Sequence, residues 1–228
     1  MKIKLETSLE KTGGTLSMPA WWTKVIAVPI PLALLATVVA IALGTTVVIF
    51  TFHASLSTNA LPQAAPSAFF LCVDTTTQGA WKHVYGSAGY AVADDHQHFP
   101  SFAQVTLPDA AHSSRWIDQI DEPRALLKPT GTRRIASTWF GWTQFTIDLN
   151  LTDDKTHRLA LYVVDWDSDA RVENIDILDA TTLQVLDHRE ISGFSDGEYL
   201  VWKVSGHINI RVIRVAGANA IINGLFLD

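Results

Sequence analysis

Phe145-Thr146-Ile147-Asp148-Leu149-Asn150-Leu151 carries apolar side chains at its odd positions and polar side chains at its even positions. Successive side chains of a strand point to opposite faces of a sheet, so this alternation predicts a strand with one buried and one exposed face. The chain around this stretch shows the same period of two, and no long stretch beyond residue 68 repeats with a helical period. The sequence therefore indicates a mainly β domain.

The neighbouring run Leu159-Ala160-Leu161-Tyr162-Val163-Val164 is polar on neither face, which predicts a strand in the centre of a sheet. Turn-forming residues such as Ser195-Asp196-Gly197 and Gly217-Ala218-Asn219 separate the apolar runs. Many short strands at a spacing of about ten residues predict an antiparallel β-sandwich or barrel. Further β-rich runs are 69–73, 102–106, 134–139, 171–178, 183–188, 198–204, 208–212 and 220–227.

A single transmembrane α-helix is expected to precede this domain, over residues 25–53. The run from Val25 to Phe52 contains no charged residue, and Pro31 to Phe52 alone would span about 33 Å as a helix, enough for the hydrocarbon core of a bilayer. A cleavable signal peptide has a shorter apolar region. Trp21 and Trp22 precede the run, where interfacial membrane anchors are typical, so membrane lipid is an expected partner.

Charge predicts the orientation of this helix and excludes one class of partner. Residues 1–24 carry four lysines against two glutamates, whereas the remainder carries 13 Lys and Arg against 21 Asp and Glu. The positive-inside rule places residues 1–24 in the cytoplasm and the acidic part on the periplasmic or extracellular side of the inner membrane. A net charge of −8 without a basic stripe argues against binding to nucleic acid. Residues 54–67, with two prolines and small polar residues, predict a linker to a domain over residues 68–228.

Motifs in residues 69–228 resemble those of the galactose-binding-like, jelly-roll modules of bacterial surface proteins. They are Asp74-Thr75-Thr76-Thr77-Gln78-Gly79-Ala80-Trp81, Tyr85-Gly86, Gly89-Tyr90, Val164-Asp165-Trp166-Asp167, Tyr199-Leu200-Val201-Trp202, Gly217-Ala218-Asn219-Ala220 and Gly224-Leu225-Phe226. The resemblance implies a noncatalytic β-sandwich in which carbohydrate is the commonest ligand, although fold transfers between relatives better than function. The absence of His-Glu-x-x-His and of a phosphate-cradling glycine loop is consistent with a protein that is not an enzyme.

Two polar clusters have the residue types of metal ligands. Asp165, Asp167 and Asp169 stand at alternate positions, as the oxygen ligands of a calcium loop do, but Ala170 takes the place of the glycine that an EF-hand requires. The reading is a Ca²⁺ site or a polar turn at the end of a strand. Residues 94–98, Asp-Asp-His-Gln-His, suit Zn²⁺ or Cu²⁺, or form a solvated loop.

Trp139, Phe140 and Trp142 surround Gly141 between two predicted strands. Large aromatic side chains are common in protein cores. At a hairpin they can also protrude, where a tryptophan ring offers a stacking face to a sugar or a contact for a protein partner. The sequence leaves core packing, ligand contact and partner contact open for these three residues.

His53 follows the apolar run in Phe52-His53-Ala54-Ser55-Leu56, which is similar to the light-harvesting α polypeptides of purple bacteria. In that family the histidine ligates the magnesium of bacteriochlorophyll, so the resemblance implies bacteriochlorophyll as a cofactor at His53, against an ordinary interfacial role. The spacing from proline to histidine is longer here, and no aromatic cluster follows. Small residues at Ala33, Ala36, Ala40 and Gly44 would permit a neighbouring transmembrane helix.

These features lead to two functional hypotheses. The first is a noncatalytic accessory or assembly subunit, whose outer β-sandwich contacts and stabilises a larger membrane complex, such as a photosynthetic reaction centre–antenna complex. The short linker, which would hold the domain near the membrane, favours this hypothesis. The alternative is a carbohydrate-binding module at the cell surface or in the periplasm. The two differ in the surface that they require, since the first needs an apolar patch and the second a cleft.

Overall fold

The computed structural model describes residues 40–43, 46–49 and 65–228, which fall into two compact units divided at Ala60. The first unit contains the strands β1 (Ala40–Leu43) and β2 (Thr46–Ile49). The second unit is mainly β and antiparallel, as the alternating sequence predicts. Its elements are β3 (Ser67–Asp74), β4 (Gly89–Val92), β5 (Gln97–His98), β6 (Ala103–Thr106), the 3-10 helix η2 (Ala110–His112), β7 (Ser113–Ile120), β8 (Leu126–Leu127), β9 (Arg134–Gly141), β10 (Gln144–Leu151), β11 (His157–Val163), β12 (Val172–Asp179), β13 (Val185–Ser192), β14 (Glu198–Ser205), β15 (His207–Ala216), β16 (Ala220–Ile222) and β17 (Gly224–Leu227).

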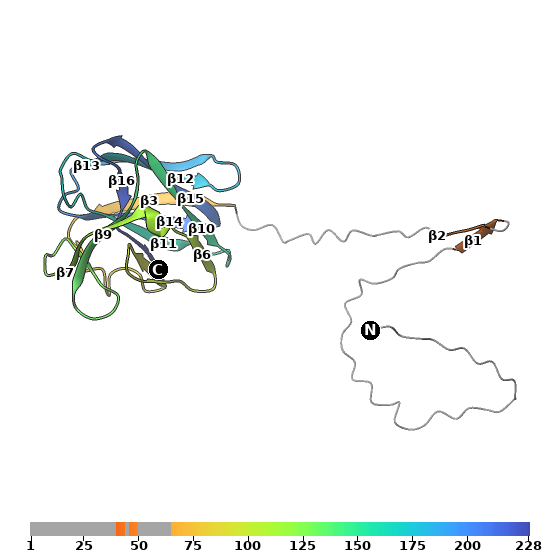
Figure 1. Cartoon of the computed structure of the whole chain (residues 1–228), viewed down its shortest axis with the longest axis horizontal. Helices are drawn as coiled ribbons and strands as arrows, with labels where there is room; N and C mark the ends of the chain where they lie inside the picture. Colours follow the sequence, from red (N-terminus) through yellow and green to blue (C-terminus); the bar gives the residue numbers. More distant parts are fainter. Residues whose placement is uncertain (1–39, 44–45, 50–64) are drawn as a thin grey trace, which may run out of the picture. The chain divides into compact units, whose positions relative to one another are not determined.

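Two sheets form the sandwich of the second unit. One sheet has five strands in the order β13-β12-β15-β10-β6, and the other has six in the order β3-β14-β11-β17-β4-β5 (Figure 1). The chain crosses between these sheets repeatedly, from β10 to β11 and back to β12. A smaller sheet, β16-β9-β7 with β8 beside β9, adjoins them.

The core between the two large sheets is built by the alternation that the sequence shows. In β10, Ile147, Leu149 and Leu151 are fully buried, and they meet inward-facing residues of β11 such as Leu159 and Leu161 in one apolar cluster. Fully buried and partly exposed side chains alternate along β10 because successive side chains of a strand point to opposite faces of the sheet. The prediction of a half-buried strand at 145–151 is confirmed.

The centre of the six-stranded sheet, around β11 and β17, is buried on both faces. Ala160, Tyr162 and Val164 point away from the first core and join a second apolar cluster, which the segments around Trp81 and Leu126 complete. The rings of Trp81 and Phe226 lie 4.9 Å apart. Strand β11 pairs with β14 on one side and β17 on the other. The prediction that residues 159–164 form a central strand is therefore confirmed. The run lacks a polar face because each of its two faces packs in an apolar cluster.

Asn223 connects the last two strands and the sheets to which they belong. β16 pairs with β9, whereas β17 pairs with β11 and β4. The amide of Asn223 accepts a hydrogen bond from the backbone N–H of Val164 at 2.7 Å and donates one to the carbonyl of Ser137 at 2.7 Å. Its own carbonyl accepts from the N–H of Ala93 at 3.1 Å. One buried side chain thus satisfies backbone groups that the change of sheet leaves unpaired.

Part of the predicted membrane helix falls on residues that the structure describes, and there it is not helical. β1 and β2 pair antiparallel, with Ala40 opposite Ile49. The β-branched run Thr46-Val47-Val48-Ile49 has the composition of a strand, which explains the difference. The rest of the predicted span 25–53 lies outside the described residues. Among those that are described, no helix has both the length and the apolar character needed to cross a bilayer.

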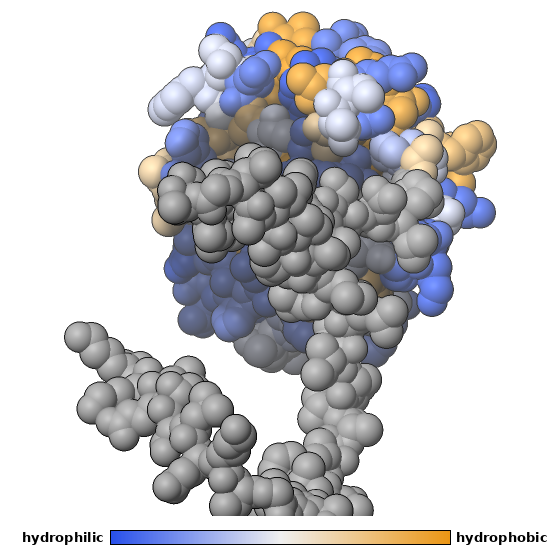
Figure 2. Space-filling model, turned by 90° about the vertical axis from the view of Figure 1, so that its right-hand side faces the viewer, coloured by the Kyte–Doolittle hydropathy of each residue, from blue (hydrophilic) through white to orange (hydrophobic). Residues whose placement is uncertain are grey.

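The surface of the second unit is mixed. Figure 2 shows apolar atoms gathered at the upper edge of the face that it displays, beside hydrophilic residues. Large apolar side chains that are exposed in the described part of the chain are Phe69, Leu71, Val73, Val84, Ile117, Trp142, Leu183, Val185 and Val215. The first three lie on β3, which begins at Ser67, one residue before the predicted start of the domain.

Candidate functional site

A tight turn between β4 and β5 presents acidic side chains at the edge of the six-stranded sheet. The N–H of Val92 donates to the carbonyl of His96 at 3.0 Å, and the N–H of Asp95 donates to the carbonyl of Val92 at 3.2 Å. Asp94 has a φ of 52°, a left-handed conformation that aspartate adopts more readily than most residues. The turn therefore projects Asp94 and Asp95 from a fixed backbone.

This turn forms one wall of a cleft of about 510 Å³. The segment from β6 through η2 forms the opposite wall, and Trp139 of β9 lies between them. The residues that line the cleft are Val92, Asp94, Asp95, His96, Gln97, Val105, Thr106, Leu107, Pro108, Asp109, Ala110, Ser113 and Trp139. A volume of this size is typical of sites for small molecules.

Asp95 has a carboxylate oxygen without a partner. Its Oδ1 lies 3.4 Å from Nδ1 of His96 and 3.9 Å from Nζ of Lys128. Its Oδ2 is buried and accepts no hydrogen bond from any residue that the structure describes. A buried carboxylate oxygen is costly to leave unpaired.

The two other carboxylates of the cleft are held in place. Asp94 Oδ2 accepts from Nε of Arg115 at 2.7 Å, and its backbone carbonyl accepts from Nη2 of the same arginine at 2.9 Å. Asp109 caps η2, and its Oδ1 lies 2.6 Å from Nδ1 of His112. The hydrogen bond from His112 holds the pKa of Asp109 below its usual value. Asp109 therefore remains an ionised acceptor at neutral pH.

The arrangement can accept hydrogen bonds from several hydroxyl or N–H donors beside an apolar wall. Gln97 adds an amide that can donate as well as accept. Val105, Leu107 and Trp139 supply the apolar wall. The cleft thus combines hydrogen-bond acceptors with an apolar wall.

Comparisons with known proteins assign no family to this chain. No family model matches the sequence. No curated protein matches it either. Among solved structures, the chain is similar to TmCBM61, a carbohydrate-binding module in complex with β-1,4-galactotriose, at 12% identity and a TM-score of 0.25, over 56% of this chain and 85% of that chain. A likeness this low carries no argument about ligand or function, and it lends nothing to the resemblance with light-harvesting polypeptides.

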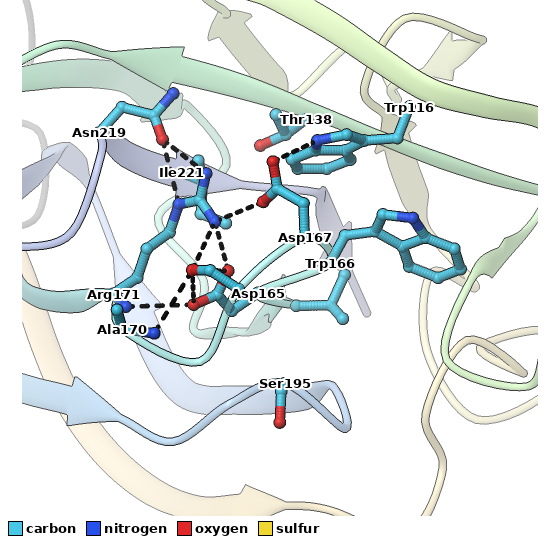
Figure 3. A network of polar contacts seen from close by, with 12 residues as sticks. Trp116, Thr138, Asp165, Trp166, Asp167, Ala170, Arg171, Ser195, Asn219 and Ile221 are labelled. Carbon is cyan, nitrogen blue, oxygen red and sulfur yellow. Dashed lines mark hydrogen bonds and ion pairs between the residues drawn. The ribbon is translucent and has the colours of Figure 1, made fainter.

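The predicted calcium ligands do not converge on a common cation position. Figure 3 shows the guanidinium of Arg171 between the carboxylates of Asp165 and Asp167. Asp169 is exposed and lies outside this network. Within the described part of the chain, no group of three or more His, Cys, Asp or Glu side chains is placed to hold a metal ion. A positive side chain takes the role that the prediction gave to Ca²⁺, and residues 94–98 form the turn beside the cleft.

The network around Arg171 extends to a second strand and a second loop. Nε and Nη2 of Arg171 donate to Oδ1 of Asn219 at 3.0 and 2.9 Å. Trp116 of β7 donates from Nε1 to Asp167 at 3.0 Å. Partial burial would raise the pKa of Asp167, but the hydrogen bonds from Arg171 and Trp116 lower it. The strand-end loop is therefore a structural clamp between β7, β12 and the β15–β16 turn.

The three predicted aromatic contacts separate into different environments. Trp139 is buried in the core and also reaches the first cleft. Phe140 is half-buried, and its ring lies 5.5 Å from that of Trp142 in an edge-to-face arrangement. Trp142 is 69% exposed. The structure thus places only Trp139 at the cleft. Trp21, Trp22 and His53 lie outside the described residues.

One catalytic pattern escaped the sequence reasoning above. Gly193-Phe194-Ser195-Asp196-Gly197 matches Gly-x-Ser-x-Gly, which in α/β-hydrolases forms a sharp turn between a strand and a helix. Here both flanks are strands, β13 and β14. The hydroxyl of Ser195 bonds to no histidine of the described chain, and it stands apart from the polar network in Figure 3. The geometry of a nucleophile with its base is not formed.

The sequence reasoning also missed Asp109 and the partnerless oxygen of Asp95. The polar run 94–98, which contains Asp95, was interpreted from its residue types as a metal site or a solvated loop. Asp109 precedes the 3-10 helix η2, which has three residues and is too short to show a periodic pattern in the sequence. The helix cap Asp109-Ala110-Ala111-His112 is a local signal that could have been used, because aspartate is a preferred cap residue.

Proposed function

We propose that the domain is a noncatalytic carbohydrate-binding module that takes up a short neutral saccharide in the cleft between the β4–β5 turn and the β6–η2 segment. The observation that carries the proposal is the lining of this cleft, which sets the carboxylates of Asp94, Asp95 and Asp109 beside the ring of Trp139. Sugar hydroxyls are donors that such carboxylates can accept.

The composition of the cleft supports a neutral ligand. Asp94, Asp95 and Asp109 repel anions, and each can accept from a hydroxyl group. Val105, Leu107 and Trp139 would contact the apolar face of a sugar ring. A cationic amine would also satisfy Asp95, and the experiment below separates the two.

The test is calorimetric titration of the full-length chain with saccharides selected on a glycan array. We expect a neutral mono- or oligosaccharide to bind, and Asp95→Asn to weaken that binding about tenfold through the loss of a charged acceptor. Asp169→Asn, which removes an exposed carboxylate outside the cleft, is the matched control and should bind as the unsubstituted chain does. Binding of simple amines in preference to every saccharide, or equal affinity of Asp95→Asn, would sink the proposal.

Attachment to a membrane through residues 25–53, with the N-terminus in the cytoplasm, stays a proposal from the sequence alone. The assembly role that it suggests has one observation in its favour. Phe69, Leu71 and Val73 expose apolar surface on β3, the first strand after the predicted linker. Extraction of the native membrane in mild detergent, followed by sizing, tests this second candidate. Migration of the chain by itself would contradict the assembly role, and co-migration with a defined complex would support that role.

A further inference from the structure

A second cleft, of about 410 Å³, is lined in part by Trp81 and Tyr85 of the second apolar cluster. The loop from Trp81 to Ser87 forms most of its lining, together with a proline, a residue of β11 and the last residue of the chain. The residues that line it are Trp81, Lys82, His83, Val84, Tyr85, Gly86, Ser87, Pro129, Arg158 and Asp228. It shares no residue with the first cleft.

The floor of this second cleft is rigid. Trp81 donates from Nε1 to the carbonyl of Leu127 at 2.7 Å, and Tyr85 donates from its hydroxyl to Oδ2 of Asp74 at 2.8 Å. Both rings are almost completely buried. Gly86 has a φ of 76°, and a Cβ there would lie 3.1 Å from the rings of Trp81 and Phe226. The loop is thus formed around the two aromatic rings before any ligand arrives.

Arg158 retains hydrogen-bonding capacity that the described residues do not use. Its Nε and Nη2 donate to Oδ2 of Asp228 at 3.0 and 2.8 Å, and Nη2 also donates to the carbonyl of Val84 at 2.6 Å. Its guanidinium carbon lies 5.1 Å from the centre of the Tyr85 ring. Nη1 bonds to no group of the described chain, so both of its N–H groups remain available.

Lys82 and His83 add further donors. Lys82 uses one N–H of its ammonium to bond the carbonyl of Gly131 at 2.9 Å, which leaves two. His83 is exposed at the rim and holds a left-handed φ of 70°. Lys82 and Arg158 thus bring two basic side chains to this cleft, beside Asp228, in a domain whose net charge is −8. The first cleft has no lysine or arginine in its lining.

We propose that the second cleft binds the carboxylate of an acidic saccharide, with a uronic acid as its simplest form. The carboxylate would accept hydrogen bonds from Nη1 of Arg158 and from Lys82, and the sugar ring would contact the apolar edge formed by Trp81 and Pro129. Arginine presents N–H pairs in the planar geometry that suits a carboxylate. This site goes beyond the neutral-saccharide cleft and does not depend on it.

The experiment is calorimetric titration of the full-length chain with digalacturonic acid, its methyl ester and acetate. We expect the acid to bind, the ester to bind about tenfold more weakly, and acetate not to displace the acid at equal concentration. Binding of the ester with the affinity of the acid, or displacement by acetate alone, would overturn the proposal.

Variants locate the site. Lys82→Gln should weaken binding of digalacturonic acid about tenfold, as should Arg158→Gln, which also frees Asp228. Because Arg158→Gln alters an ion pair, Lys82→Gln carries the test if that variant unfolds. Lys203→Gln removes an exposed lysine of β14 and is the matched control. Unchanged binding in Lys82→Gln, or loss of binding in Asp95→Asn, would contradict the assignment; the second result would move the acid to the first cleft.

Discussion

Arg171 and Asp165 form an ion pair in the interior of the domain, where their side chains are only 3% and 1% exposed. Loss of one partner leaves the other charge buried and unpaired, which costs about 3–5 kcal/mol. Arg171→Met should therefore lower the free energy of unfolding by about that amount, measured by urea titration. Arg214→Met, which removes one exposed hydrogen bond to Gly217, should change it by less than about 0.5 kcal/mol. Equal effects of the two variants would show that the pair is unimportant.

Calcium should leave the stability of the protein unchanged. Arg171 already neutralises Asp165 and Asp167, so a divalent cation between them would meet a guanidinium. A filled site at a hundred times its dissociation constant would add about 2.7 kcal/mol to the free energy of unfolding. Thermal unfolding with Ca²⁺ and with a chelator should give the same midpoint. A rise of several degrees on addition of Ca²⁺ would restore the metal site that the sequence suggested.

Glu173 should make stability fall as pH rises. Burial raises the pKa of Glu173 to about 8, from an ordinary value of 4.5, while its Oε1 accepts from the N–H of Ile221 at 2.9 Å. Between these two values the folded chain holds a proton that the unfolded chain has released. The free energy of unfolding therefore declines by up to about 1.4 kcal/mol per pH unit across this window and levels off above it.

Glu173→Gln isolates this effect, because the amide does not titrate. Relative to the unsubstituted chain, the variant should gain stability as the pH is raised from about 5 to about 9. Urea titrations of both proteins at the two pH values measure the difference, in which the other titrating groups cancel. A difference that stays constant with pH would show that Glu173 is ionised in the folded chain.

Gly197 should tolerate no side chain. Its φ is 81°, and a Cβ would lie 1.9 Å from the hydroxyl oxygen of Tyr162, which donates to the carbonyl of Arg124 at 2.6 Å. Gly197→Ala should cost more than about 2 kcal/mol, since the buried tyrosine would have to move. Gly193 has a φ of 68° with open space around it, so Gly193→Ala should cost only about 1 kcal/mol for the left-handed backbone. Urea titration of both variants gives the two losses in free energy of unfolding. Equal losses would contradict the close approach of the Tyr162 hydroxyl to Gly197.

Trp139 and Trp142 should differ sharply in their effect on stability although they are three positions apart. Trp139 is buried, so Trp139→Ala should cost about 3–5 kcal/mol. Trp142 is exposed, and Trp142→Ala should stay within about 0.5 kcal/mol. Chemical unfolding of both variants provides the comparison. A large loss from Trp142→Ala would contradict the exposure of its ring.

The sequence predicted the strands of the core best. β10 and β11 carry the hydrophobic pattern of the core, so both could be predicted from the alternation of apolar residues. The sequence also predicted β3 and β13, which are largely exposed, from their β-rich composition. β7 and the four-residue β4 were missed because neither shows an alternation that is long enough to recognise.

The candidate sites were less accessible to prediction, because they join segments far apart in the chain. Asp95, Asp109 and Trp139 come from three separate elements, and no local pattern links them. Asp165, Asp167 and Asp169 have a ligand-like spacing, but their charge is balanced by Arg171, and spacing alone cannot show which side chain turns inward. Burial and hydrogen-bond partners, rather than residue type, distinguish the carboxylates that Arg171 binds from those that line the first cleft.

β17 occupies the interior of the six-stranded sheet, between β11 and β4, although it lies at residues 224–227. On the ribosome, β11 and β4 can each pair on one side only until this stretch has been synthesised. The other edges of β11 and β4 would stay open during that interval, which is the kind of surface that chaperones cover and that aggregates when they do not. The acidic turn after β4 depends on the same event, because Asn223 holds Ala93 directly before it. The wall that this turn gives to the first cleft is therefore complete only after translation has passed residue 227.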